Sequence, residues 1–166
     1  MSSVALLRGI NLGKLNKVDM KSLKLLFEEL GFQNVRTYIQ TGNVIFDGGG
    51  CSEEKLEEAL RNTYGFEIPV VVRSKAELEE ISKNPLFLND QTFVMFLRKE
   101  ITNDELSILK GIVEDDFIVL HNRNLIIHHT KNYHQTKYTN NFFEKKLQMV
   151  STARNKNTVN KILERM

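Results

Sequence analysis

The order of strand-like and helix-like segments is the strongest constraint on this fold, because the same order occurs twice. Residues 1–73 contain an apolar run, an amphipathic helix pattern, two β-type runs, a second helix pattern and a β-branched run. Residues 92–154 follow the same order with different residues. Two copies of the order βαββαβ predict an α+β fold with two ferredoxin-like (α/β plait) subdomains in tandem.

Local signals in the first copy agree with this order. Asp19 and Ser52 are of the types that cap helices, and Gly65 is typical of a helix end. Thr41 and Gly42 predict a turn between two short strands. The first strand, VALL, is apolar at successive positions, which indicates a sheet that is buried on both faces. We therefore expect the two halves to pack together.

Capping and turn signals also divide the rest of the chain. Two capping boxes, Ser74-Lys-Ala-Glu77 and Thr102-Asn-Asp-Glu105, open a connecting helix and the first helix of the second copy. A hairpin is expected around Arg123-Asn124, and Asn157 is expected to cap a last helix. The expected domains are a first plait subdomain over residues 1–74, a connecting helix and loop over 75–91, and a second plait subdomain with a C-terminal helix over 92–166.

The composition is that of a soluble globular protein, with 41% hydrophobic and 27% charged residues. No apolar run approaches the roughly 20 residues of a membrane-spanning helix, so no membrane partner is expected. Cys51 is the only cysteine, which excludes an internal disulfide and fits a reducing cytoplasm. The sequence holds no Walker loop, Gly-x-Ser-x-Gly or HExxH motif, and no cofactor is expected.

The net charge is only +2, but the charges are unevenly placed along the chain. Residues 1–24 contain five cations and one acid, and residues 131–166 contain eight cations and two acids. The middle segment, residues 25–130, has a net charge of −8. If the two ends meet in space, the protein has a basic face suited to an anionic partner. The alternative is solvated charge scattered over the surface.

The segment Arg8–Lys17, RGINLGKLNK, lies between the first strand and the first helix and contains three cations, two glycines and no acid. Glycines allow close approach of the backbone to a ligand, and free N–H groups at the start of the following helix attract anions. Lys21 and Lys24 oppose the dipole of that helix, which suggests that they serve a ligand. The alternative is a flexible surface loop with ordinary lysines.

Two further segments carry polar groups that could face the same ligand. Ser151–Lys161 brings an arginine, which can hold a phosphate or carboxylate with two parallel bonds, next to asparagines. Tyr38–Asn43 places polar side chains at a hairpin. Taken alone, each segment is explained at least as well by ordinary turn and cap chemistry.

The four histidines do not predict a metal site. His128 and His129 are adjacent on a strand and therefore face opposite sides, and no cysteine or close carboxylate completes a ligand set. We interpret the histidines as lone residues near a sheet edge. Cys51 has no evident activating partner either.

Four stretches, ALLRGINLG, TYIQTGNVIF, KYTNNFFEKKL and STARNKNTV, resemble the bacterial family known as domain of unknown function 1697. The resemblance covers nearly the whole chain. It implies two α/β plait subdomains and no established activity. Lys156 stands where the family usually has Trp, so a ligand that stacks on that Trp would bind differently here or not at all.

These observations lead to three functional hypotheses. The first is a cytoplasmic binding protein for a phosphate-bearing or other anionic ligand, a nucleotide or nucleic acid, in a basic cleft between the subdomains. The second is an enzyme on a small anionic metabolite, with Tyr38 transferring a proton. The third is a non-catalytic interaction protein that forms oligomers, since ferredoxin-like sheets readily pair at their edges. Whichever hypothesis holds, we expect a monomer or a homodimer. The candidate ligand-binding residues are Arg8, Gly9, Asn11, Gly13, Lys14, Tyr38, Gly42, Asn43, Lys137, Arg154, Asn155, Asn157 and Thr158.

Overall fold

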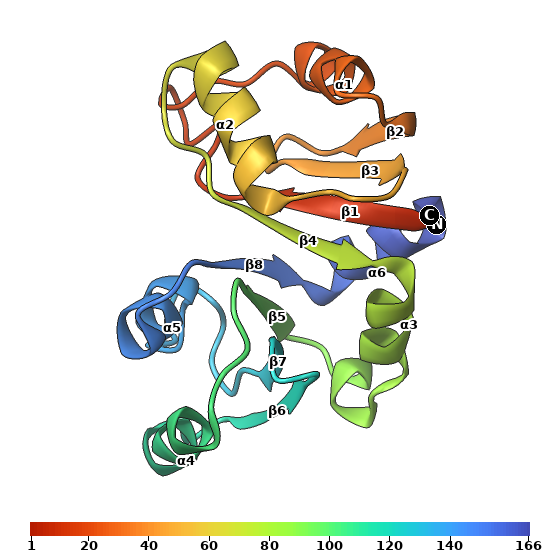
Figure 1. The fold of residues 1–166 in the computed structure, drawn as a ribbon. Helices are drawn as coiled ribbons and strands as arrows, with labels where there is room; N and C mark the ends of the chain where they lie inside the picture. Colours follow the sequence, from red (N-terminus) through yellow and green to blue (C-terminus); the bar gives the residue numbers. More distant parts are fainter. The chain divides into compact units, whose positions relative to one another are not determined.

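The structure is a computed structural model that describes residues 1–166 (Figure 1). The chain divides into two compact units, residues 1–78 together with 162–166, and residues 79–161. Each unit contains one four-stranded antiparallel sheet, which confirms the predicted α+β fold with two βαββαβ units. No helix combines the length and the apolar character needed to cross a bilayer.

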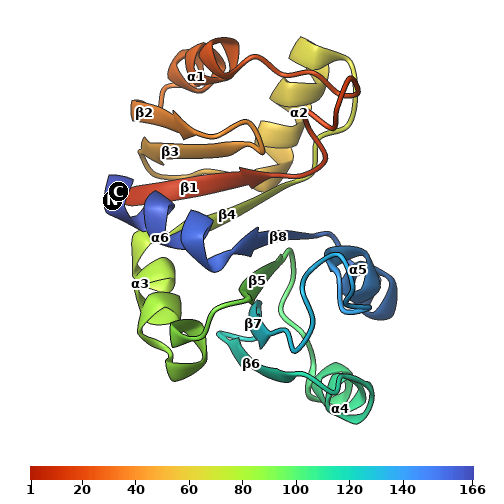
Figure 2. The ribbon, with the colours of Figure 1, turned by 180° about the vertical axis from the view of Figure 1, so that it is seen from behind.

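The first unit is a four-stranded sheet with two helices on one face. Its elements are β1 (Ser2–Leu7), α1 (Met20–Glu29), β2 (Gln33–Tyr38), β3 (Asn43–Asp47), α2 (Glu53–Tyr64) and β4 (Val70–Ser74), followed by α3 (Lys75–Lys83). The strand order is β2-β3-β1-β4, and every neighbouring pair is antiparallel. Helices α1 and α2 lie on the same side of this sheet in both ribbon views (Figures 1 and 2).

The second unit repeats this arrangement. After η1 (Pro85–Leu88), it contains β5 (Thr92–Leu97), α4 (Asn103–Ile112), β6 (Asp116–Leu120), β7 (Asn124–His128), α5 (Asn140–Leu147) and β8 (Ser151–Asn155), followed by α6 (Lys156–Arg165). The strand order is β6-β7-β5-β8, again with antiparallel neighbours. Helices α4 and α5 cover one face of this sheet (Figure 1).

The predicted capping residues hold the helix ends of the first unit. The side chain of Asp19 accepts a hydrogen bond from the backbone N–H of Ser22, and that of Ser52 accepts one from Lys55. Gly65 ends α2 in the left-handed conformation, at φ 81°. Both predicted capping boxes, at the starts of α3 and α4, are also present.

Each sheet buries an apolar face against its own two helices. In the first unit Phe27 and Phe46 are fully buried, with ring centroids 5.6 Å apart. In the second unit Ile127 and Phe143 are fully buried in the corresponding core. Residues Val4–Leu7 of β1 are all buried, so both faces of that strand are buried, as its unbroken apolar run predicted.

The predicted hairpin of the second unit is present, whereas the predicted cap of its last helix is wrong. The turn between β6 and β7 lies at residues 121–123 and includes Arg123, and Asn124 is the fully buried first residue of β7. The cap of α6 is Asn155, whose Oδ1 accepts from the backbone N–H of Thr158 at 2.8 Å. Asn157 already lies inside the helix, so its side chain is too far along the chain to cap the first turn.

The strand registers show that the two units are repeats of one pattern. On the first strand of each unit, Leu6 pairs with Asn43 and Phe96 pairs with Asn124. Asn43 and Asn124 therefore occupy equivalent positions at the start of the third strand, and both are fully buried.

The fourth strands match in the same way. Val4 pairs with Arg73, and Val94 pairs with Arg154, so these two arginines are equivalent. Each fourth strand runs directly into a helix, α3 or α6. The repeated pattern is therefore βαββαβα, and it includes the helix that sequence reasoning took for a connector.

Candidate functional site

The loop after β1 is compact and closes on itself. The backbone N–H of Asn11 donates to the carbonyl of Asn16 at 2.9 Å, and Leu12 and Leu15 exchange two backbone hydrogen bonds. Gly13, between these leucines, lies at φ 58°, which glycine adopts without strain. The segment is thus a small, hydrogen-bonded hairpin that presents Lys14 at its tip, and not the flexible loop of the alternative interpretation.

The side chain of Asn11 joins this loop to the turn between β2 and β3. Its Nδ2 donates to the carbonyls of Val18 at 3.1 Å and Gln40 at 2.9 Å. Its Oδ1 accepts from the backbone N–H of Val18 at 2.9 Å. Two of the three segments singled out in the sequence therefore meet within the first unit.

The turn at residues 39–42 depends on its glycine and on Asn43. A Cβ on Gly42 would lie 2.8 Å from both Ile10 Cδ1 and Leu7 Cβ, and the residue has φ 96°. Asn43 Nδ2 donates to the carbonyl of Tyr38 at 2.9 Å and to Thr41 Oγ1 at 3.2 Å. Gly42 and Asn43 are thus placed to hold the turn, which agrees with the turn-chemistry alternative.

Ile39, in the same turn, has an unusual backbone conformation. It lies at φ 49°, where a β-branched residue is strained, and its side chain is exposed. Such strain persists only where the surrounding structure holds it, and it is common near functional sites. Here the hydrogen bonds of Asn11 and Asn43 hold the turn on either side of Ile39.

A hollow of about 410 Å³ lies where this loop, this turn and the start of α1 meet. Its cations are Lys17 and Lys21, both exposed, and Gln40 comes from the turn. The Asp19 carboxylate also borders it, but accepts from the N–H of Ser22 at 2.9 Å. This carboxylate caps one backbone N–H at the start of α1, and the predicted attraction of an anion to the free N–H groups of this helix start stays a prediction. The two lysines carry the positive charge of the hollow.

Arg8 and Tyr38 lie in the first unit as well, each in a defined contact. The backbone N–H of Arg8 donates to the carbonyl of Pro69 at 2.9 Å, and its side chain is half-buried. The guanidinium of Arg165 lies over the ring of Tyr38, 4.5 Å from its centroid. Arg165 also accepts, through its carbonyl, a hydrogen bond from Arg36 Nε at 3.1 Å. Tyr38 thus presents its ring to an arginine of this chain.

Arg154 and its repeat equivalent Arg73 are buried arginines. Arg154 Nη1 donates to Thr152 Oγ1 at 2.8 Å and to the carbonyl of Ala153 at 2.9 Å, and burial lowers its pKa to about 10. Arg73 Nη1 likewise donates to the carbonyl of the preceding residue, Val72, at 2.9 Å. The repeated geometry favours a structural role for both side chains.

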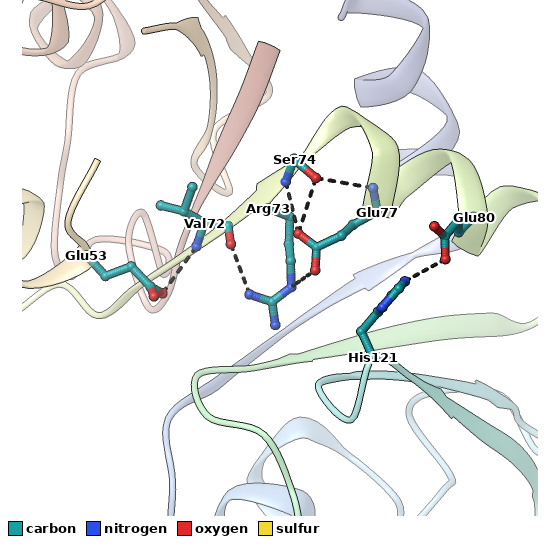
Figure 3. A network of polar contacts seen from close by, with 7 residues as sticks. All are labelled: Glu53, Val72, Arg73, Ser74, Glu77, Glu80 and His121. Atoms are coloured by element: carbon teal, nitrogen blue, oxygen red, sulfur yellow. Dashed lines mark hydrogen bonds and ion pairs between the residues drawn. The ribbon is translucent and has the colours of Figure 1, made fainter. Parts of the chain in front are cut away.

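Figure 3 shows the surroundings of Arg73. Arg73 Nε lies 3.8 Å from Glu77 Oε1, and Glu77 also accepts from the backbone N–H of Ser74 to cap α3. Glu53 Oε2 accepts from the backbone N–H of Val72 at 3.2 Å. The arginine is thus built into the junction between β4 and α3.

Three further candidate residues, Lys137, Asn155 and Asn157, line two small hollows of the second unit. Asn155 and Asn157 border a hollow of about 270 Å³, together with Lys156, whose Nζ donates to the carbonyl of Leu88 at 3.0 Å. Thr158 is buried and donates its N–H to Asn155. Lys137 instead borders a hollow of about 160 Å³. Lys137 and the C-terminal segment therefore do not line one site.

Two histidines are paired with carboxylates, which corrects the interpretation of all four as lone residues. His121 Nε2 bonds to Glu80 (Figure 3), and the buried His129 Nδ1 lies 3.2 Å from Asp115 Oδ2. Burial lowers the pKa of His129, and its Nε2 has no hydrogen-bond partner. No group of three His, Cys, Asp or Glu side chains that could hold a metal ion is found in the structure.

Cys51 follows the three glycines after β3. Burial, and secondarily the charge of Glu53, raise the pKa of its thiol to about 11. The thiol is therefore protonated at neutral pH and is a poor nucleophile. This agrees with the absence of an activating partner in the sequence.

Sequence reasoning missed the residues that the repeat makes equivalent. Arg98 is equivalent to Arg8. The backbone N–H of Arg8 donates to the carbonyl of Pro69, and that of Arg98 donates to the carbonyl of Val150; each of these carbonyls directly precedes the fourth strand of its unit. The signal was the pair Leu-Arg at the end of each first strand. Arg8 belongs to one unit and Arg154 to the other, so a pocket shared by them stays a prediction.

Comparison with known proteins identifies a family but no activity. Residues 1–125 match the family described as "Protein of unknown function (DUF1697)". Among solved structures, the conserved bacterial protein SP0830 from Streptococcus pneumoniae is similar, with 23% identity, a TM-score of 0.72, and coverage of 99% of this chain and 97% of that chain. This likeness concerns the fold alone. No curated protein matches. Because the family match spans most of the chain, the protein belongs to the DUF1697 family.

Proposed function

We propose that this protein binds a phosphate-bearing ligand, a nucleotide or a nucleic acid, at the hollow of its first unit. The observation that carries the proposal is the pair Lys17 and Lys21 at one hollow of about 410 Å³. The carboxylate of Asp19 is already bonded to a backbone N–H. Two ammonium groups beside a neutral amide, that of Gln40, suit an anion that keeps part of its hydration.

The repeat supports this assignment. Val18 and Asp19 directly precede α1, and Ile101 and Thr102 directly precede α4. The segment between the first strand and these residues is 8–17 in the first unit and the much shorter 98–100 in the second. The turn at residues 39–42 is likewise longer than its equivalent at 121–123. The two segments that the first repeat has in addition meet through Asn11 and line the hollow. Segments that the fold does not need twice are candidates for function.

The chemistry of the hollow favours binding over catalysis. Its lining residues include no nucleophile beside a base. In the enzyme hypothesis Tyr38 is the residue that transfers a proton, but the guanidinium of Arg165 lies over its ring. Lysine contacts to phosphate depend on charge more than on sequence, so we expect affinity that falls as salt rises.

The test is binding of a fluorescent single-stranded oligonucleotide and of a set of mononucleotides to the wild type and to the double variant Lys17→Gln/Lys21→Gln. We expect the variant to bind at least about 10-fold more weakly and to show a smaller salt dependence. Preference for the oligonucleotide or for one mononucleotide identifies the ligand class.

Lys24→Gln is the matched control, because Lys24 lies outside the hollow and pairs with Glu28 at 3.8 Å. Its affinity should stay within about twofold of the wild type, as expected of a rim charge. Equal affinity of the double variant and the wild type, or binding of no phosphate compound by the folded wild type, would contradict the proposal.

A further inference from the structure

Strand β6 has an outer edge that no element of the second unit covers by hydrogen bonds. It is an edge strand of its sheet, and residues Asp116–Leu120 all pair in regular register with β7 (Figures 1 and 2). Beyond β7 and the turn that joins the two strands, β6 makes no hydrogen bond. The opposite edge strand of the sheet, β8, is largely buried, whereas Ile118 in the middle of β6 is 40% exposed.

The equivalent strand of the first unit, β2, is protected. Its register shifts between Gln33 and Arg36, and Asn34 lies at φ 51°, so a bulge distorts the edge. Tyr38 pairs with Asn43 as Leu120 pairs with Asn124. Two residues before Tyr38 is Arg36, and two residues before Leu120 is Ile118, so Arg36 and Ile118 occupy equivalent positions.

The two residues at this equivalent position, Arg36 and Ile118, give the two strand edges different protection. Arg36 donates to the carbonyls of Asn34 at 2.6 Å and of Arg165 at 3.1 Å, so the C-terminal segment lies against β2. A bulge, a charge and a covering segment are the means by which proteins prevent pairing at strand edges. Strand β6 has no bulge, and its middle residues, Phe117 to Val119, are all apolar.

We propose that β6 pairs antiparallel with the β6 of a second copy of this chain, which makes the protein a homodimer. Antiparallel pairing about a twofold axis is self-complementary, since the same strand supplies both sides. It also brings the exposed Ile118 of each copy to the centre of the contact. The unpaired backbone N–H and C=O groups of each edge then find partners.

The charges at the two ends of β6 favour this occupant and this direction. The strand begins beside the exposed Glu114 and Asp116, and it ends at a turn that carries Arg123 and His121, whose ring is bonded to Glu80. Antiparallel pairing sets the acidic start of one copy against the turn of the other. Parallel addition of the same strand would instead set acid against acid.

The test is sedimentation velocity of the full chain over a concentration series. We expect a concentration-dependent dimer in the wild type and a monomer in Ile118→Arg, which gives β6 the charge that β2 has. The matched control is Leu25→Arg, which replaces a 57% exposed apolar residue of α1 and should leave the dimer intact. Circular dichroism verifies that each variant is folded.

A second variant keeps the proposal testable if Ile118→Arg fails to fold. Glu114→Lys/Asp116→Lys removes the charge complementarity and should raise the dimer dissociation constant at least about 10-fold, and less so at high salt. Hydrogen exchange should show protection of β6 amides that rises with protein concentration. A wild type that stays monomeric up to about 0.5 mM, or a dimer unchanged in both variants, would overturn the proposal.

Discussion

The two repeats share a skeleton but differ in what they add to it. Both have an arginine at the end of the first strand, a buried asparagine at the start of the third and a buried arginine on the fourth. Only the first has the long loop after β1 and the longer turn after β2. The shared residues hold the fold wherever it occurs, and the added segments are free to serve a ligand.

This comparison changes the meaning of the candidate residues. Arg8, Asn43 and Arg154 looked functional in the sequence, yet each has an equivalent in the other repeat. Lys17 has none, because it lies in the added loop, and Gln40 lies in a turn that is one residue longer than its equivalent. The repeat thus distinguishes residues that both units share from those of the site that we propose.

The largest effect is expected from Gly42→Ala. The added Cβ would lie 2.8 Å from Ile10 Cδ1 and Leu7 Cβ, at φ 96°, so we expect a loss of about 2–4 kcal/mol in the free energy of unfolding. Chemical denaturation measures it. Gly13→Ala is the control, because nothing lies within 4 Å of its added Cβ, and it should cost only about 1 kcal/mol. Equal losses would show that packing against Ile10 does not require the glycine.

The next effect tests whether the buried asparagines are truly equivalent. Asn43→Ala and Asn124→Ala should each lower the free energy of unfolding by about 1–3 kcal/mol, because each removes a buried polar group from the start of a third strand. The loss is read from denaturant midpoints. Ligand affinity of the folded Asn124→Ala protein should equal that of the wild type. A stability loss confined to one variant would show that the two positions differ in function.

The sequence was sufficient for features that depend on neighbours along the chain. Caps such as Asp19 and Ser52 act within one turn of helix, so their residue types predict the helix starts. The cap of α6 is harder to predict, because Asn155 and Asn157 lie close together and only the end of β8 determines which of them precedes the helix.

Contacts between distant segments could not be predicted. Asn11 reaches Gln40 only because β1 and β3 are neighbours in the sheet, which sets the turn beside the loop. Likewise, Asp115 meets His129 because Asp116 pairs with His128, and a shift of register would separate them. The sequence predicts the repeat as an order of strands and helices, whereas the strand registers are needed to show which buried residues of the two units are equivalent.

A smaller effect is expected from the buried His129, which has no equivalent in the first unit. Burial lowers its pKa below 6.5, so the folded state keeps the ring neutral, with Nδ1 donating to Asp115. As the pH falls through about 6.5, the unfolded chain takes up a proton that the folded protein does not, and the free energy of unfolding decreases. Denaturation at a series of pH values should show this decline. The decline in the free energy of unfolding should be weaker in His129→Gln than in the wild type, and the exposed control His134→Gln should show the wild-type decline. Equal pH dependence of all three proteins would contradict this explanation.

The smallest effect on stability, and the sharpest on function, is expected at the first turn of α1. The equivalent helix α4 begins with Asp104 and Glu105, which suit its dipole, whereas α1 has no acid in its first turn and has Lys21 there. Lys21→Gln should therefore raise the free energy of unfolding by about 0.3–1 kcal/mol while weakening binding of a phosphate-bearing ligand. Thermal unfolding with and without the best-binding oligonucleotide or nucleotide measures both. A variant that is less stable, or that binds as tightly as the wild type, would mean that Lys21 is retained for the fold, and the contrast between the two helix starts would carry no functional meaning.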